Sequence, residues 1–133
     1  AQHKFFRLKI PSSYISDPHI QFMSANSLGK KDVVVAISQS GTTSALLDSV
    51  RIVRKSGVKV IGIMPGRTPL ADICDYPLTI DVGDNNRLSK PNTSRIAYTA
   101  VIDVMTMGVA QLKPEAQEHL YNIVDSQRSL RVK

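Results

Sequence analysis

The sequence contains little cysteine and few aromatic residues. Cys74 is the single cysteine of the 133 residues, so no internal disulfide can form, and this fits a reducing cytoplasm. Tryptophan is absent and aromatic residues make up 5% of the chain, which argues against the base-stacking platforms of proteins that bind RNA or single-stranded DNA. No uninterrupted apolar run reaches the roughly 18 residues of a membrane-spanning helix, and no apolar region of a signal peptide follows residues 1–4. We therefore expect a cytoplasmic protein with no membrane segment.

Charge and composition are those of an ordinary globular domain with a positive surplus. Hydrophobic residues make up 42% and charged residues 21%, and the net charge is +6 at pH 7. The positive charges are spread along the chain, so they either favour anionic partners or form a solvated surface. The basic residues 128–133 lack an accompanying recognition helix, so direct nucleic-acid binding is not expected. Neither a metal nor another cofactor is expected, because the histidines and the cysteine lie far apart in sequence, at His3, His19, Cys74 and His119.

Strand and helix patterns alternate along the chain. Residues 33–37 and 58–64 are nearly continuous apolar runs, typical of strands buried on both faces of a parallel sheet. Between them, residues 43–56 place apolar side chains on one helical face, and Gly57 can end that helix. We also predict short strands at 12–16 and 76–82, and helices at 1–9, 17–28, 70–75, 93–112 and from Pro114 onward. This order favours an α/β fold with a doubly wound parallel sheet, in a single domain covering residues 1–133.

The segment from Ser38 to Thr43 is the strongest candidate for a binding site. Its sequence is Ser-Gln-Ser-Gly-Thr-Thr, and it joins a predicted buried strand to a predicted helix. Ligands of open α/β sheets bind at the carboxyl ends of strands, and a helix N-terminus offers unpaired N–H groups to an anion. Gly41 lets the backbone approach a phosphate closely, while Ser38, Ser40 and Thr43 add hydroxyl donors. We expect the backbone amides of this loop to point at one anion; the alternative is that these are only turn and cap residues.

Residues 34–43, Val-Val-Ala-Ile-Ser-Gln-Ser-Gly-Thr-Thr, resemble the S-x-S-G-x-T signature of SIS (sugar isomerase) domains. The strand at 58–64 and the pair Leu70-Ala71 follow in the order of that family, and the resemblance covers nearly the whole chain. It implies a flavodoxin-like three-layer sandwich whose first strand and first loop are missing here, so that the chain is N-terminally truncated. It also implies that the phosphate of a sugar is held by Ser38, Gln39, Ser40 and Thr43.

Two further segments resemble the effector domains of RpiR-type transcription regulators, and within them the HexR group. They are residues 90–97, Lys-Pro-Asn-Thr-Ser-Arg-Ile-Ala, and residues 17–21, Asp-Pro-His-Ile-Gln. The resemblance implies a domain that binds a phosphorylated sugar or sugar acid, which is 2-keto-3-deoxy-6-phosphogluconate in the HexR group. It implies DNA binding through a helix-turn-helix domain that this chain lacks. Dimers are common among SIS relatives, and the apolar helix predicted at 93–112 also favours a homodimer or a higher homo-oligomer.

SIS domains also occur in isomerases, so an aldose–ketose isomerase is the alternative function. That reaction needs a general base, usually a glutamate, and Glu115 and Glu118 lie far from the loop in sequence. His19 is the remaining acid–base candidate, although a single histidine at a helix start is more often a surface residue. Lys90 and Arg95 are candidates to bind the carboxylate or phosphate of the ligand, or else they are simply solvated. We therefore expect a sensor with no catalytic residues rather than an enzyme.

Overall fold

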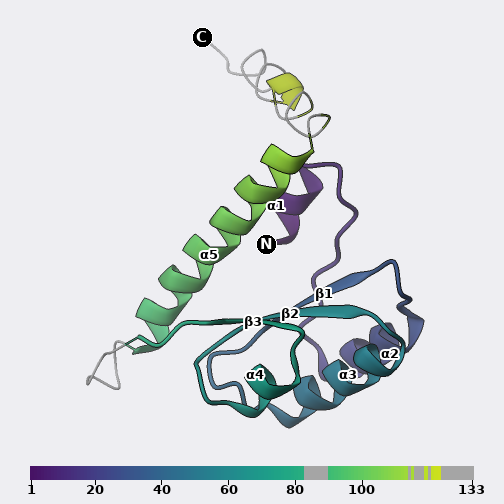
Figure 1. The fold of residues 1–133 in the computed structure, drawn as a ribbon, viewed down its shortest axis with the longest axis vertical. Coiled ribbons are helices and arrows are strands. Elements are labelled where there is room, and N and C mark those ends of the chain that lie inside the picture. The colour runs from purple at the N-terminus through teal and green to yellow at the C-terminus, as the bar shows by residue number, and fades with distance from the viewer. Residues whose placement is uncertain (83–89, 114, 116–118, 120, 124–133) are drawn as a thin grey trace. The chain divides into compact units, whose positions relative to one another are not determined.

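The chain forms two compact units. The computed structural model describes residues 1–82, 90–113, 115, 119 and 121–123. The sheet unit comprises residues 15–98, and the terminal unit comprises residues 1–14 together with the described residues from 99 onward (Figure 1). Helix α5 (Lys90–Leu112) contributes residues 90–98 to the sheet unit and its remaining residues to the terminal unit.

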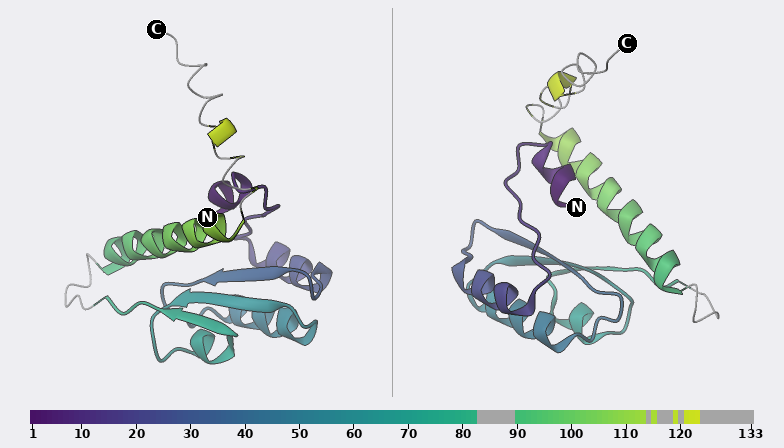
Figure 2. Two further views of the ribbon diagram at one scale, coloured as in Figure 1. Left: turned by 45° about the horizontal axis from the view of Figure 1, so that its top comes forward. Right: turned by 180° about the vertical axis from the view of Figure 1, so that it is seen from behind.

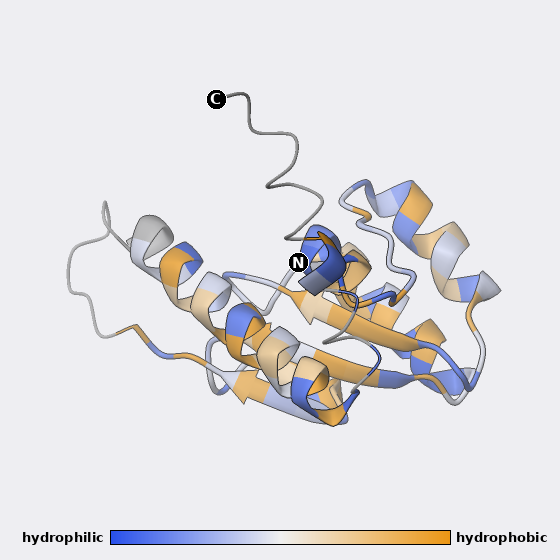
Figure 3. Ribbon diagram, turned by 90° about the horizontal axis from the view of Figure 1, so that it is seen from above, coloured by the Kyte–Doolittle hydropathy of each residue, from blue (hydrophilic) through white to orange (hydrophobic). Residues whose placement is uncertain are grey.

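Three parallel strands form the centre of the sheet unit. They lie side by side in the order β1-β2-β3, with bounds Val33–Ile37, Lys59–Met64 and Tyr76–Thr79. Val35 lies opposite Ile61, and Ile63 lies opposite Leu78. Residues with branched side chains dominate β1 and β2, as the pleated surface of a buried strand favours, and the strands are predominantly hydrophobic in Figure 3. The predicted parallel sheet is therefore confirmed, although β3 ends three residues before the predicted Val82.

Helices lie on one face of this sheet, and buried side chains from each of them belong to its core (Figures 1 and 2). They are α2 (Pro18–Ser27), α3 (Ser44–Lys55) and α4 (Pro69–Ile73). The predicted N-cap of α2 is confirmed, because a side-chain oxygen of Asp17 accepts the N–H groups of His19 (2.9 Å) and Ile20 (3.0 Å). The predicted end of α3 is also confirmed, since Gly57 adopts the left-handed φ of 78° that often follows a helix.

Both faces of the sheet bury apolar side chains. On one face, Leu47, Val50 and Val53 of α3 belong to a single core with the strand residues Ala36, Val60 and Met64. Ile63 is completely buried but is not part of that core. Because side chains alternate along a strand, Ile63 belongs to the opposite face. Burial on both faces is what a doubly wound sheet requires.

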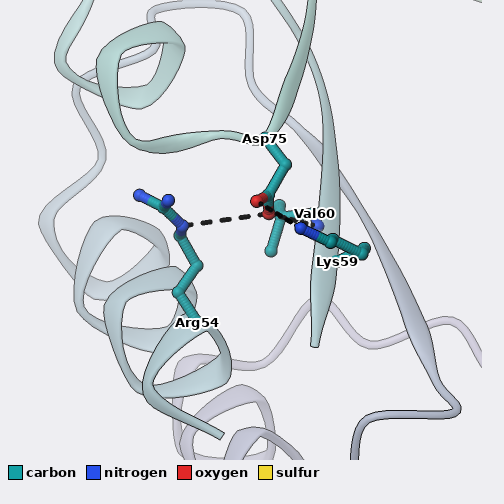
Figure 4. Close-up of polar contacts among 4 residues, drawn as sticks. All are labelled: Arg54, Lys59, Val60 and Asp75. Atoms are coloured by element: carbon teal, nitrogen blue, oxygen red, sulfur yellow. Dashed lines mark hydrogen bonds and ion pairs between the residues drawn. The ribbon is translucent and has the colours of Figure 1, made fainter. Parts of the chain in front are cut away.

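An ion-pair cluster ties β2 to the segment that enters β3 (Figure 4). The carboxylate of Asp75 accepts the Val60 N–H at 3.0 Å and lies 3.3 Å from the Lys59 ammonium and 3.8 Å from the Arg54 guanidinium. The backbone hydrogen bond from Val60, followed by the Lys59 side chain, lowers the pKa of Asp75. Lys59 begins β2, so this cluster lies at the amino ends of the strands and holds the sheet together at the edge opposite the candidate loop.

The terminal unit contains α1 (Gln2–Phe6) and the later part of α5. Gln2 and Ser12 exchange side-chain-to-backbone hydrogen bonds of 3.0 and 3.1 Å, and Lys4 forms an ion pair with Asp103 of α5. The strand predicted at 12–16 is wrong: these residues adopt no regular structure. Their carbonyl groups bond to side chains instead of a neighbouring strand, as when Gln21 donates to the Ile15 carbonyl oxygen at 3.2 Å.

Helix α5 begins at Lys90, three residues earlier than predicted. Its sequence pattern predicts burial on more than one side, whereas Ile96, Val104 and Met107 are exposed in the single chain. The final helix predicted from Pro114 lies largely outside the described residues. No helix in the described part of the chain has the length and hydropathy needed to cross a membrane.

Candidate functional site

The Ser38–Thr43 loop lies where the sequence predicts it, between the carboxyl end of β1 and the first turn of α3. The Ser38 N–H donates to the Ile63 carbonyl oxygen at 3.0 Å, so the pairing of β1 with β2 continues into the first loop residue. Ser38 is buried, while Gln39, Ser40 and Thr43 are exposed. The loop therefore begins inside the sheet unit and reaches the surface as it enters the helix.

Two serine hydroxyls hold the loop in its curved shape. Ser38 Oγ accepts the Gly41 N–H at 2.9 Å, and Ser40 Oγ accepts the Thr42 N–H at 3.3 Å. A hydroxyl that accepts a hydrogen bond keeps its own proton for another acceptor. The expectation that all loop amides point at one anion is wrong for Ser38, Gly41 and Thr42, because their N–H groups bond within the protein.

Gly41 is the one residue of the loop that no other amino acid can replace without strain. Its φ is 65°, and a Cβ atom added to it would lie 2.3 Å from Thr68 Oγ1. The Gly41 carbonyl oxygen also accepts the Leu70 N–H at 3.1 Å. Thr68 in turn caps α4 by accepting the Ala71 N–H at 3.4 Å. The loop is thus packed tightly against the start of α4, a contact that local sequence patterns do not reveal.

The N-terminus of α3 lacks a side-chain cap. Asp17 and Thr68 cap α2 and α4 through their side chains, whereas Thr43, the N-cap residue of α3, makes no such hydrogen bond. The first backbone hydrogen bond of the helix runs from the Leu47 N–H to the Thr43 carbonyl oxygen, at 3.0 Å. The first-turn N–H groups and the positive end of the helix dipole are therefore available to an anion, together with the Thr43 hydroxyl.

Tyr98 of α5 holds the loop from the other side. Its hydroxyl donates to the Ser38 carbonyl oxygen at 3.3 Å, and the side chain is buried. Burial, followed by the negative charge of Asp81, raises the pKa of Tyr98, so the hydroxyl keeps its proton for this bond. Sequence reasoning missed Tyr98; the available signal was its spacing of four residues from the small residue Ser94, which is also buried.

The other three predicted site residues, His19, Lys90 and Arg95, lie on helices outside the loop. His19 is exposed in the first turn of α2, and its backbone N–H is used by the Asp17 cap. Arg95 is exposed on α5, three residues before Tyr98 and hence near the same helical face, and it interacts with neighbouring groups. Lys90 is the first residue of α5, and its side chain lies outside the described part of the structure. The structure therefore places the five loop residues together between β1 and α3, and the binding roles of all eight predicted residues stay predictions.

The described residues do not bring three histidine, cysteine, aspartate or glutamate side chains together in a way that could hold a metal ion. Cys74 is buried, and burial, followed by the nearby Asp75 carboxylate, raises the pKa of its thiol. The side chains of the Ser38–Thr43 loop offer hydroxyl and amide groups for hydrogen bonding.

Comparison with known proteins identifies the relatives of this chain. The model of the SIS domain family matches residues 1–108. The chain is 38% identical over 110 residues to the bifunctional protein glk of Burkholderia thailandensis, a match that covers 83% of this chain and 17% of that protein. It is 36% identical over 108 residues to the HTH-type transcriptional regulator HexR of Escherichia coli, covering 81% of this chain and 37% of the regulator. The chain thus spans less than half the length of these two relatives.

The fold is also that of solved structures. The Vibrio vulnificus NanR protein complexed with ManNAc-6P matches 98% of this chain and 50% of its own, with a TM-score of 0.84. Its sequence identity is 17%, so the likeness supports the α/β fold with a parallel sheet and carries no statement about the ligand.

Proposed function

Because this chain belongs to the SIS domain family, we propose that it is the effector-binding domain of a sugar-phosphate-responsive transcription regulator. In this proposal the domain binds a phosphorylated sugar or sugar acid at the Ser38–Thr43 loop, and binding controls a DNA-binding domain outside this chain. The similarity to the regulator HexR supports the regulatory role. A regulator of this kind acts in the cytoplasm.

The observation that carries the binding site is the start of α3, which lacks a side-chain cap and follows the loop that leaves the carboxyl end of β1. Unpaired amides at a helix N-terminus favour an anion, and the helix dipole adds to the attraction. Ser40 and Thr43 are exposed beside these amides, and the hydroxyl of each can donate a hydrogen bond to a phosphate oxygen. A phosphate suits this arrangement because its several oxygens can accept bonds from hydroxyl and amide donors at the same time.

The proposed effector is 2-keto-3-deoxy-6-phosphogluconate. Two observations support this choice over the phosphate of a sugar that has no carboxylate. Residues 17–21 and 90–97 resemble the HexR group, and the chain is similar to the E. coli regulator of that name. The carboxylate of such an effector would need a second cationic group, for which Arg95 and Lys90 are the candidates from the sequence. Arg95 is close to the helical position of Tyr98, whose hydroxyl reaches the loop.

The competing function is a sugar-phosphate isomerase, and the residues of the sheet unit argue against it. Residues 15–98 contain no glutamate, and the Asp81 carboxylate already accepts the Gly66 N–H at 2.9 Å. His19 is exposed, and its side chain makes no hydrogen bond with another described residue. The base for aldose–ketose isomerisation is usually a glutamate that reaches the substrate carbon, and the sheet unit offers no glutamate for that task.

A thermal-shift and calorimetry panel on the purified protein tests the proposal. The panel contains phosphorylated sugars, phosphorylated sugar acids including 2-keto-3-deoxy-6-phosphogluconate, and the matching unphosphorylated compounds. We expect stabilisation by phosphorylated compounds alone, and the strongest by the phosphorylated acid. A coupled assay on the same compounds should show no turnover. Turnover that disappears in His19→Ala would support the isomerase. If none of the phosphorylated compounds binds, the binding site is refuted.

A further inference from the structure

We propose that Arg67 is a further anion-binding residue of this site, and that its guanidinium binds the phosphate held at the Ser38–Thr43 loop. The proposal rests on the function proposed above and adds the cationic partner that the loop itself lacks. Sequence reasoning did not select this arginine, because it lies outside every motif. The structure selects it through its backbone conformation, its position and its lack of a polar partner among the described residues.

The backbone of Arg67 is strained. Its φ is 53°, in the left-handed region that residues other than glycine, asparagine and aspartate rarely adopt. Among the described residues, Lys9 also has a positive φ, of 55°, but it lies three residues after the end of α1. There the Ile10 N–H donates to the Phe5 carbonyl oxygen, a common way to end a helix. Arg67 ends no helix. It lies in the turn between β2 and α4, where Thr68 Oγ1 donates to the Pro65 carbonyl oxygen at 3.0 Å. Strain of this kind is concentrated at functional sites.

The position of Arg67 brings it beside the loop. Its neighbour Thr68 contacts Gly41 so closely that any Cβ on that glycine would overlap the threonine side chain. Adjacent Cα atoms are about 3.8 Å apart, so the Arg67 backbone lies one residue from a direct contact with the loop. β1 and β2 are paired and parallel, and their carboxyl ends therefore meet at the same edge of the sheet. An arginine side chain on this turn is long enough to reach an anion at that edge.

The guanidinium is available for such an anion. Arg67 is exposed and forms no hydrogen bond or ion pair with another described residue. By contrast, Arg51 is paired with Asp48 at 2.8 Å, and Arg54 is paired with Asp75 at the opposite edge of the sheet. The Asp81 carboxylate lies beside this turn, where it accepts the Gly66 N–H at 2.9 Å, and it forms no ion pair with Arg67.

The chemistry of the loop explains why a cation is needed. The Ser38–Thr43 segment contains no charged side chain, so its hydroxyls and amides can bind a phosphate dianion without neutralising it. The planar fork of arginine donates two parallel hydrogen bonds to phosphate oxygens, and a lysine cannot reproduce that geometry. Glycine is the residue that would adopt a φ of 53° without strain. An arginine at this position therefore costs stability, and a contribution to anion binding would account for its presence.

The experiment compares Arg67→Gly, Arg67→Lys and wild type. Calorimetry measures the affinity for 2-keto-3-deoxy-6-phosphogluconate, and competition with inorganic phosphate provides a second probe. Thermal unfolding without added ligand measures stability. Arg67→Gly should raise the Tm by roughly 3 °C, because the strain is relieved, and should weaken the affinity for both probes about tenfold to hundredfold. Arg67→Lys should lie between the two in affinity. Arg51→Ala is the matched control, since it removes an equal charge from α3 and should leave both affinities unchanged.

The outcomes separate this inference from the proposed function. If wild type binds neither probe, the phosphate site itself is refuted, and the role of Arg67 with it. If wild type binds and Arg67→Gly binds equally well, the site stands and the inference about Arg67 is refuted. If Arg67→Gly lowers the Tm without changing affinity, Arg67 stabilises the turn instead, which also overturns the inference.

Discussion

Replacing Gly41 by alanine should destabilise the protein far more than a single methyl group usually does. Gly41 has a φ of 65°, and its missing Cβ atom would lie 2.3 Å from Oγ1, 2.5 Å from Cβ and 2.8 Å from Cγ2 of Thr68. The Cβ atom of Thr68 does not move when its side chain rotates, so a rotation of Thr68 cannot relieve every overlap. Either the loop or the turn before α4 must move.

The size of the effect follows from two terms. An L-residue in the left-handed region costs roughly 1–2 kcal/mol. Displacing Thr68 weakens its hydrogen bonds with the Pro65 carbonyl oxygen (3.0 Å) and the Ala71 N–H (3.4 Å), and a net hydrogen bond contributes about 1 kcal/mol. We therefore expect Gly41→Ala to lower the free energy of unfolding by about 2–4 kcal/mol, within the range of overpacked core substitutions.

Urea unfolding of the purified protein, followed by circular dichroism, measures this loss. Gly29→Ala is the matched control, because no atom lies within 4 Å of the corresponding Cβ position and Gly29 has no positive φ. That variant should change the free energy of unfolding by less than about 0.5 kcal/mol. A loss below about 1 kcal/mol in Gly41→Ala would show that the loop can move away from Thr68, and the account of its rigid shape would then be wrong.

Three further predictions concern the ligand, the ion-pair cluster and assembly. Ser40→Ala should weaken phosphate-ligand affinity about tenfold to hundredfold, since a hydrogen bond to a charged group is lost; unchanged affinity in calorimetry would exclude that role. The folded state lowers the pKa of Asp75, so its stabilisation is present at neutral pH and is lost as the pH falls through the folded-state pKa. The urea midpoints of wild type and Asp75→Asn should therefore differ at neutral pH and converge in acid, and a pH-independent difference would contradict this. Exposed apolar residues of α5 should mediate self-association; a monomeric wild type in light scattering, or an unaltered dimer in Val104→Glu, would count against it.

The elements that sequence reasoning predicted well are those defined by local patterns. The apolar runs of β1 and β2, the Asp17-Pro18 helix start and the Gly57 helix end each depend on a few neighbouring residues. The binding loop belongs to the same class, because its signature is contiguous and lies between a strand and a helix that are themselves predictable. The strand predicted at 12–16 failed because strand formation needs a partner, and a short polar segment carries no information about whether one exists.

The contacts that shape the site could not be predicted in this way, because they join residues far apart in sequence. Tyr98 reaches Ser38 across 60 positions, and Thr68 determines that position 41 must be glycine. The strained φ of Arg67 is invisible in its own sequence, since Pro65-Gly66 suggests a turn whose glycine, rather than its arginine, would be left-handed. The Tyr98 and Thr68 contacts appear only in the folded chain, where α5 and the turn before α4 lie against the loop.

The geometry of the loop also assigns different tasks to residues that its signature treats alike. Ser38 is buried, its hydroxyl accepts the Gly41 N–H, and its carbonyl oxygen accepts the Tyr98 hydroxyl. Such a residue shapes the loop before any ligand arrives. Ser40 and Thr43 are exposed at the start of α3, where their hydroxyl protons can be donated to an anion. A loop already held in shape loses less conformational entropy on binding. The rigidity contributed by Ser38, Gly41 and Thr68 would therefore raise the affinity of the loop for an anion, even though the hydroxyl donors are those of Ser40 and Thr43.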